Sequence, residues 1–176
     1  MDFLLQIDAG LFDFIYYLPH PPLLNHFFNF LSGVGSWGLI WIIILVLLIA
    51  VDEVDDKRDL FTVILSLIIT ILSVDIVIKN IFRRARPDVS ISEPIVFLGR
   101  VSSYSFPSSH AAFAFAGAYI LSRKHKKGKI FYYLLAMLIA FSRIYLGKHF
   151  PIDVVVGSGV GMVIGYISVE LSKKIK

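Results

Sequence analysis

Apolar runs of helical length, separated by short charged turns, set the pattern of this chain. The run at 36–51 is unbroken, and with its flanks it reaches the roughly 20 helical residues that a bilayer core requires. We therefore expect an all-α integral membrane helix bundle. The runs predict five transmembrane helices, at about 36–51, 60–78, 108–121, 130–146 and 151–171.

Residues 1–35 predict shorter helices at the membrane interface. At helical spacing, polar positions of the first 18 residues form one stripe and apolar positions cover the rest. This pattern favours an amphipathic helix that lies in the interface or packs on the bundle. Pro19 to Pro22 end it, and a Phe-rich segment follows at 23–31. With this region as an incomplete sixth span, residues 1–176 are expected to form a single membrane domain of five to six transmembrane helices.

Composition supports a membrane location. The chain of 176 residues is 57% hydrophobic and 17% charged, with a mean hydropathy of +0.77, whereas a soluble domain is typically about half apolar. Cysteine is absent, so disulfides and thiolate metal sites are unavailable. The net charge of +4 comes from short basic clusters between apolar runs, which argues against nucleic acid as a partner and for a role in membrane topology.

The basic clusters predict the orientation. The turns at 52–59 and 123–129 and the tail at 173–176 fall on one side and hold ten Lys and Arg residues, so this side should be cytoplasmic. The connection at 79–106 and the turn at 147–150 then face outward. We expect a multi-pass protein of the cytoplasmic membrane with its polar site on the periplasmic or extracellular side. Four aromatic residues are predicted as interface anchors, Trp37 and Trp41 outside and Tyr132 and Tyr133 inside.

Three polar clusters on the predicted outer face suit phosphoryl transfer. Lys79, Arg86 and Arg143 can clamp phosphate oxygens, since guanidinium groups match their geometry. Ser108 and Ser109 begin a predicted helix, where hydroxyls and free backbone N–H groups form an anion site. Such a cradle needs no cofactor or metal, and the acidic residues of this face are too scattered to form a cation cage.

Two histidines can carry the chemistry. Asp153 follows His149 by four residues, so its carboxylate can reach back, fix the imidazole tautomer and free the other nitrogen to attack phosphorus. A carboxylate that merely favours the helix dipole is the alternative for Asp153. His110 would protonate the leaving oxygen and later activate water. Asp75 lies four residues before Lys79 and is expected to pair with it without acting on phosphate.

Small residues recur on two predicted spans. Gly157, Gly161 and Gly165 are spaced by four, and the run at 108–121 is rich in alanine. If these faces meet, His110 comes near His149. A generic interface, such as a dimer contact, is the equal alternative, and the oligomeric state stays open.

In order and spacing, the polar residues match the three signature motifs of the type-2 phosphatidic acid phosphatase family. The motifs are Lys, six residues, Arg-Pro at 79–87; Pro-Ser-x-His at 107–110; and Ser-Arg, five residues, His, three residues, Asp at 142–153. The chain thus resembles this family over 79–153, in a highly specific combination. The resemblance implies a metal-independent lipid phosphatase that works through a phosphohistidine on His149.

The resemblance also implies the other roles. His110 is the acid, Asp153 orients, and Lys79, Arg86, Ser108, Ser109 and Arg143 hold phosphate. Two features depart from the family: Ser109 stands where Gly is usual, and five spans are secure where membrane members usually have six. If the backbone N–H at 109 binds phosphate, a side chain there should be tolerated.

The sequence leaves several alternatives open. Phosphatidylglycerophosphate, a polyprenyl diphosphate such as undecaprenyl diphosphate, phosphatidic acid and lipid A 1-phosphate all fit, because the motifs read phosphate and not the rest of the lipid. A lipid phosphotransferase using the same histidine and a non-enzymatic lipid-binding protein are the rivals, and vanadate haloperoxidases are similar at these motifs. The roles of Arg83 and Arg84 are undecided.

Overall fold

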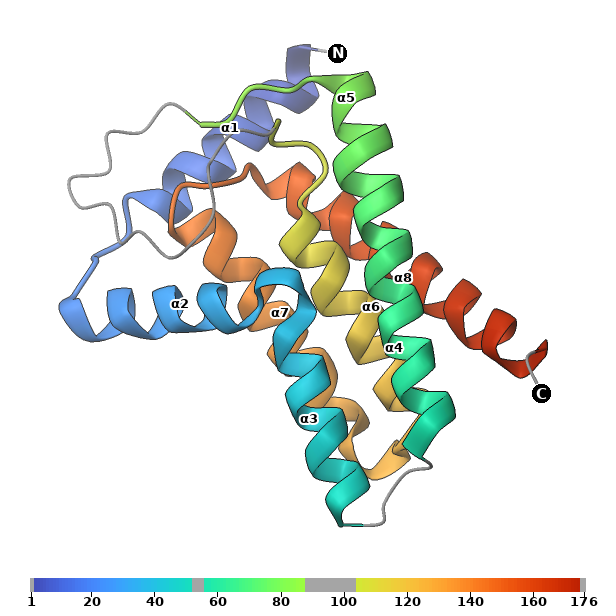
Figure 1. Cartoon of the computed structure of the whole chain (residues 1–176). Coiled ribbons are helices and arrows are strands. Elements are labelled where there is room, and N and C mark those ends of the chain that lie inside the picture. Colours follow the sequence, from blue (N-terminus) through green and yellow to red (C-terminus); the bar gives the residue numbers. More distant parts are fainter. Residues whose placement is uncertain (1, 52–55, 88–103, 175–176) are drawn as a thin grey trace.

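The structure, a computed structural model, is an all-helical bundle, and it describes residues 2–51, 56–87 and 104–174 (Figure 1). The elements are, in order, α1 (Asp2–Tyr16), α2 (Pro22–Val34), the 3₁₀ turn η1 (Ser36–Gly38), α3 (Leu39–Ala50), α4 (Asp56–Thr70), the π-helical stretch η2 (Ile71–Ile78), α5 (Lys79–Phe82), α6 (Ser109–Lys124), the 3₁₀ turn η3 (Lys126–Gly128), α7 (Lys129–Tyr145) and α8 (Pro151–Lys174). The prediction of an all-α multi-pass membrane protein is confirmed.

The structure accounts for some of the five to six predicted membrane spans. In the described part of the chain, three helices are long and apolar enough to cross a bilayer: Arg58–Phe82, Lys126–Tyr145 and Pro151–Lys174. The pair Pro22–Val34 and Ser36–Ala50, bent by 56°, makes a fourth if it is one span. The central helix α6 has 16 residues, about 24 Å at 1.5 Å per residue, which is short of a bilayer core. Five to six spans therefore stay a prediction.

Helix boundaries follow the predicted runs closely, with one difference. Pro151 occupies the first position of α8, where a proline lacking an N–H is tolerated. Lys79 was expected in a connection, but α4, η2 and α5 continue without a break to Phe82, so Lys79 lies in the last helical turn. Of the predicted turn at 52–59 and connection at 79–106, residues 52–55 and 88–103 lie outside the described residues.

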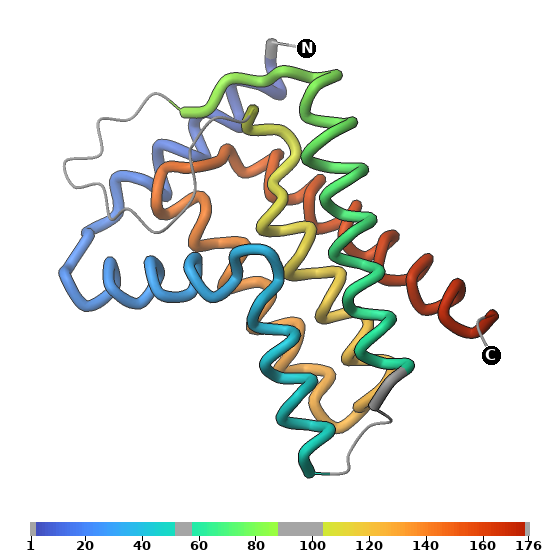
Figure 2. Tube along the Cα trace, viewed as in Figure 1, coloured from blue at the N-terminus to red at the C-terminus, as the bar shows by residue number. Residues whose placement is uncertain are grey.

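Helix α6 is the centre of the bundle, and α4, α7 and α8 pack around it (Figure 2). Its contact with α8 uses the small residues that the sequence singled out. A Cβ added at Gly157 would lie 2.5 Å from the carbonyl oxygen of Ser108, and one at Gly165 would lie 2.8 Å from that of Ala116. At Gly161 it would overlap the carbonyl of Ala112. The two small-residue faces thus meet within one chain, as one of the two sequence alternatives predicted.

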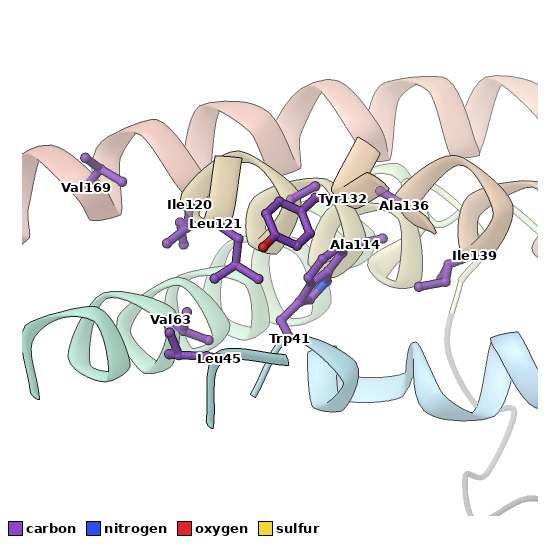
Figure 3. Close-up of a cluster of buried hydrophobic side chains, with 11 residues drawn as sticks. Trp41, Leu45, Val63, Ala114, Ile120, Leu121, Tyr132, Ala136, Ile139 and Val169 are labelled. Carbon is purple, nitrogen blue, oxygen red and sulfur yellow. The ribbon is translucent and has the colours of Figure 1, made fainter. Parts of the chain in front are cut away.

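Two of the predicted interface anchors belong to the core instead. Trp41 is 0% and Tyr132 2% exposed, and both lie in the cluster of buried side chains between α3, α6 and α7 (Figure 3). The Trp41 indole fills the space above Gly117, where no Cβ would fit. The hydroxyl of Tyr132 lies 2.6 Å from Nδ1 of His125. The interface prediction for Trp41 and Tyr132 is therefore wrong, because each ring packs where a glycine leaves room, Trp41 beside Gly117 of α6 and Tyr132 beside Gly128 of η3.

The N-terminal region packs against the end of the bundle that holds the polar motifs. Helix α1 contacts α7 and α8, with Phe12 and Asp8 turned inward and most of its other apolar side chains exposed. Helix α2 runs across the bundle and contacts α7 (Figure 1). The chain then turns sharply, because Trp37 and Gly38 adopt positive φ angles of 55° and 68°. Residues 1–35 therefore form two helices that both pack on the bundle, and their place at the membrane interface stays a prediction.

We expect Gly161→Ala to destabilise the protein by about 1–3 kcal/mol, because the added methyl group overpacks the contact between α6 and α8. Gly159→Ala is the matched control on the same helix, since a Cβ there meets nothing within 4 Å. The control should be neutral or stabilising by up to about 1 kcal/mol. Thermal unfolding of both variants in one detergent measures the difference, and equal midpoints would contradict the packing described above.

Candidate active site

The three polar motifs meet at one end of the bundle, where α5 ends, α6 begins and α7 turns into α8. The first and second are joined by Lys79 Nζ, which donates to Ser109 Oγ at 2.6 Å. The first and third are joined by Arg86 Nη1, 3.1 Å from His149 Nε2. The second and third are joined by the Ser108 N–H, which donates to the carbonyl of Asp153 at 2.9 Å. Every pair of motifs is therefore in direct contact.

His149 lies in the tight turn between α7 and α8. Its backbone N–H donates to the Arg143 carbonyl at 3.1 Å, and its side chain is 1% exposed. Nδ1 is 3.6 Å from Oδ2 of Asp153, which is too long for a hydrogen bond, and has no other partner among the described residues. The same oxygen accepts the N–H of Phe150 at 3.0 Å. Asp153 thus faces the imidazole and caps the start of α8 at once.

Burial lowers the pKa of His149 well below its usual 6.5, and nearby positive charges lower it further. These charges belong to Arg143, Arg86 and Lys79. The imidazole is therefore neutral at neutral pH. A proton on Nδ1, toward Asp153, leaves the lone pair on Nε2, where it accepts from the Arg86 guanidinium.

Lys79, Asp75 and Ser109 form a closed polar triangle. Lys79 Nζ is 2.7 Å from Asp75 Oδ1, which confirms the predicted pairing, and Ser109 Oγ donates to the same oxygen at 2.5 Å. Lys79 is buried and Asp75 half-buried. Ser109 stands where the family motif usually has Gly. Its side chain therefore links the second motif to the first by hydrogen bonds.

His110 and Arg143 meet two hydroxyls of the N-terminal region. Ser36 Oγ lies 3.1 Å from His110 Nε2, and Arg143 Nη1 donates to Ser32 Oγ. Ser36 Oγ also donates to the Ser32 carbonyl at 3.0 Å. Nε of Arg143 is buried without a hydrogen-bond partner in the described part of the chain. A buried guanidinium nitrogen that is left unsatisfied is suited to bind an anion.

Ser108 is used by the fold itself. It is fully buried, its hydroxyl accepts the N–H of Ala111 at 3.4 Å as the N-cap of α6, and its own N–H is bonded to Asp153. The expectation of a free backbone N–H at Ser108 is therefore wrong, because α6 approaches α8 so closely that this N–H donates to the Asp153 carbonyl. In the first turn, the N–H of Ala111 is taken by the Ser108 hydroxyl and that of Ala112 bonds the Ser108 carbonyl at 3.0 Å. Helix geometry leaves the N–H groups of Ser109 and His110 without a partner inside α6.

Several polar residues that contact the site lie outside the three motifs or were not assigned a role by them. Ser32, Ser36 and Asp8 come from the N-terminal region, and their contacts bridge 111, 74 and up to 144 positions of the chain. Arg84, left open by the sequence, contacts both Asp8 and Asp153. One feature of the sequence could have indicated that Asp8 has a partner in the fold: a charged residue in an apolar helix is costly unless it is paired.

Comparison with known proteins identifies the family. The family model described as the PAP2 superfamily matches residues 59–176, about two thirds of the chain, including all three motifs. The chain belongs to the PAP2 superfamily. It is a PAP2 lipid phosphatase of the membrane, a member of a family of metal-independent hydrolases. Among the described residues, no group of three or more His, Asp or Glu side chains is arranged to hold a metal ion.

PAP2 relatives with different named substrates resemble the chain to a similar degree. It is 30% identical to an undecaprenyl-diphosphatase of Sulfolobus acidocaldarius, over 84% of this chain and 70% of that protein. It is 29% identical to a lipid A 4'-phosphatase of Porphyromonas gingivalis, over 94% of this chain and 73% of that protein. The crystal structure of Aquifex aeolicus LpxE matches with a TM-score of 0.75 and 33% identity, covering 93% and 95% of the two chains. Such similarities do not fix the substrate of this PAP2 phosphatase.

We expect Ser109→Ala to lower the stability of the phosphatase by about 1–3 kcal/mol, since it removes one partner from a buried charged pair. Ser158→Ala removes a hydroxyl that bonds only the Val154 carbonyl, at 2.8 Å, and serves as the control. Ser158→Ala should change the free energy of unfolding by no more than about 0.5 kcal/mol. Thermal unfolding in detergent compares the two, and equal losses would mean that the Ser109 hydroxyl does not hold Lys79 and Asp75 together.

Proposed function

We propose that the protein hydrolyses the terminal phosphate of a membrane lipid through a covalent phosphohistidine on His149. The observation that carries this proposal is the pairing of a buried neutral imidazole with unsatisfied positive charge. Nε2 of His149 accepts from Arg86, and the buried Nε of the neighbouring Arg143 has no hydrogen-bond partner in the ranges that the structure describes. Such a pocket attracts an anion and presents a nucleophile to it.

Phosphate is held by Arg86, Arg143, Lys79 and the start of α6. The guanidinium groups clamp phosphoryl oxygens, and the first-turn N–H groups add the positive end of the helix dipole. Ser109 contributes its backbone N–H, while its hydroxyl keeps Lys79 in place. Ser108 acts indirectly, as the cap that fixes the start of α6. Asp75 holds Lys79 and does not touch phosphate.

In the first step, Nε2 of His149 bonds to phosphorus as the bond from phosphorus to the lipid oxygen breaks. Asp153, 3.6 Å from Nδ1, stabilises the positive charge that develops on the imidazole. The pair closes when the site is occupied, since catalytic hydrogen bonds are often long in empty sites.

His110 supplies the proton that the leaving lipid oxygen takes. Because the Ser36 hydroxyl donates to the Ser32 carbonyl, it can only accept from His110, so Nε2 of His110 carries a proton. His110 acts as the acid in its imidazolium form and becomes a neutral imidazole when the lipid oxygen takes a proton from it. In the second step His110 takes a proton from water, the water oxygen bonds to phosphorus, and the bond from phosphorus to His149 breaks. Phosphate leaves and both histidines return to their starting forms.

We further infer that the site faces the periplasmic or extracellular side of a cytoplasmic membrane. At the opposite end of the bundle, Lys124 pairs with Asp59 and Arg58 Nε donates to the Ser172 carbonyl at 3.1 Å. These contacts join the basic ends of α4, α6 and α8, which the positive-inside rule assigns to the cytoplasm. In this proposal, residues 1–176 form one membrane domain with five spans, and residues 1–35 are an incomplete sixth.

The substrate is a phosphomonoester or diphosphate lipid that reaches the pocket from the bilayer. Phosphatidylglycerophosphate, undecaprenyl diphosphate, phosphatidic acid and lipid A 1-phosphate share the terminal group that the cationic pocket reads. Names of relatives support three of these lipid classes: the polyprenyl diphosphates, lipid A and phosphatidylglycerophosphate.

We expect purified protein to release phosphate from at least one of these four lipids in EDTA, and His149→Ala to lose at least about 10³-fold in kcat, as removal of a catalytic nucleophile does. Rapid quenching with ³²P-labelled lipid should trap an acid-labile phosphoenzyme in the wild type only. Equal release by His149→Ala would refute the mechanism. Transfer of phosphate to a second lipid without free phosphate would instead identify a phosphotransferase.

We expect His110→Ala to lose far more activity on a lipid phosphate than on p-nitrophenyl phosphate, whose leaving group needs no proton. General acid catalysis contributes about 10²–10⁴-fold, so the lipid rate should fall by that factor and the aryl rate much less. Ser36→Ala should shift the ratio in the same direction by a smaller amount. Equal losses on both substrates would show that His110 is not the acid.

A further inference from the structure

Arg84 joins two buried carboxylates that come from opposite ends of the chain. Its Nη1 is 2.7 Å from Oδ1 of Asp153 on α8, and its Nη2 is 2.6 Å from Oδ2 of Asp8 on α1. Asp153 is 0% and Asp8 4% exposed. The guanidinium also lies over the ring of Phe150, 4.2 Å from its centroid. Both terminal nitrogens of Arg84 thus face protein carboxylates.

These contacts fix the plane of the Asp153 carboxylate. Arg84 holds Oδ1, and the Phe150 N–H holds Oδ2, the oxygen that faces His149 Nδ1. With both oxygens held, the carboxylate cannot rotate away from the imidazole. The orientation of His149 then depends on Arg84 through Asp153.

Asp8 extends this control to the N-terminal helix. Its Oδ1 accepts the N–H of Ile152 at 2.8 Å, in the first turn of α8, while Oδ2 accepts from Arg84. Helix α1 therefore contacts the region around His149 in two ways: Asp8 binds the backbone of Ile152 directly, and it binds Asp153 through the Arg84 side chain. This helix lies outside residues 59–176, which the family model matches.

We propose that the Asp8 and Arg84 pair positions Asp153, and through it His149, so that α1 is part of the catalytic machinery. Arg84 is a positioning residue and not a phosphate ligand, because both of its terminal nitrogens are engaged by carboxylates. The proposal rests on the proposed role of His149. It assigns Arg84 and Arg86, two residues apart, to different tasks.

The test compares Arg84→Gln, Arg84→Lys and Asp8→Asn on the lipid that the wild type hydrolyses fastest. We expect Arg84→Gln to lower kcat by about 10- to 100-fold, as loss of an orienting partner does, with KM within about threefold. Arg84→Lys should recover little of this loss, since a single ammonium group does not reproduce a fork that bridges two carboxylates. Asp8→Asn should lower kcat less, and the double variant Asp8→Asn with Arg84→Gln no more than Arg84→Gln alone.

Two matched controls and a second readout separate positioning from folding. Arg83→Gln changes the neighbouring exposed arginine, whose Nε bonds the Asn80 carbonyl, and Asp13→Asn changes an exposed carboxylate of α1. Both should keep wild-type kcat. Rapid-quench formation of the phosphoenzyme should slow in the Arg84 and Asp8 variants in proportion to kcat, because the attack by His149 is the step affected. If Arg84→Gln does not fold, Asp8→Asn, which is nearly isosteric, decides alone.

An unchanged kcat in the Arg84 and Asp8 variants would overturn the positioning role, and so would a rise in KM with unchanged kcat, which would make Arg84 a ligand of the substrate. His149→Ala is assayed beside them. Full activity of His149→Ala would refute the proposed mechanism instead, so the two failures give different results.

Discussion

The close approach of the α6 and α8 backbones is the constraint on which the candidate site depends. Gly157 and Gly161 leave no room for a Cβ, and where they face α6 the Ser108 N–H bonds the Asp153 carbonyl directly. Because the starts of both helices lie at that contact, the motif that begins α6 and the motif that begins α8 share one end of the bundle. In a membrane, where apolar side chains gain little by leaving lipid, such contacts rely on close packing and on polar bonds.

Charge at this end of the bundle is divided between structure and chemistry. Lys79 pairs with Asp75, and Arg84 pairs with Asp8 and Asp153, so these cations keep buried carboxylates satisfied. Arg143 faces a hydroxyl, and Arg86 faces an imidazole nitrogen and a carbonyl. The Nε of Arg143 is buried without a hydrogen-bond partner among the described residues, and such an unsatisfied group raises the energy of the empty site. In the proposed function, a phosphate oxygen is the partner that relieves this cost.

The sequence predicted the parts of the fold and site that depend on local spacing. The helix boundaries follow from the apolar runs and the charged turns between them. The pairing of Asp75 with Lys79 and the glycine stripe of α8 follow from spacings of four residues. The contacts of Ser32, Ser36 and Asp8 could not be predicted, because they join residues far apart in the chain and belong to no recurring pattern. Trp41 was misplaced for a related reason: whether an aromatic ring anchors at the interface or fills a core depends on what its neighbours leave open, here Gly117.

The bend at Trp37 and Gly38, where both residues have positive φ angles, sets which residues of the N-terminal region contact the candidate site. At this bend the direction of the chain changes from that of α2 to that of α3. Ser32 on α2 contacts Arg143, and Ser36 in η1 contacts His110. Inserting one residue within α2, after Ser32, would rotate the upstream part of that helix by about 100° and carry the Ser32 hydroxyl off the guanidinium. The spacing from Ser32 to Ser36 is therefore constrained by two contacts at the site, one with Arg143 and one with His110.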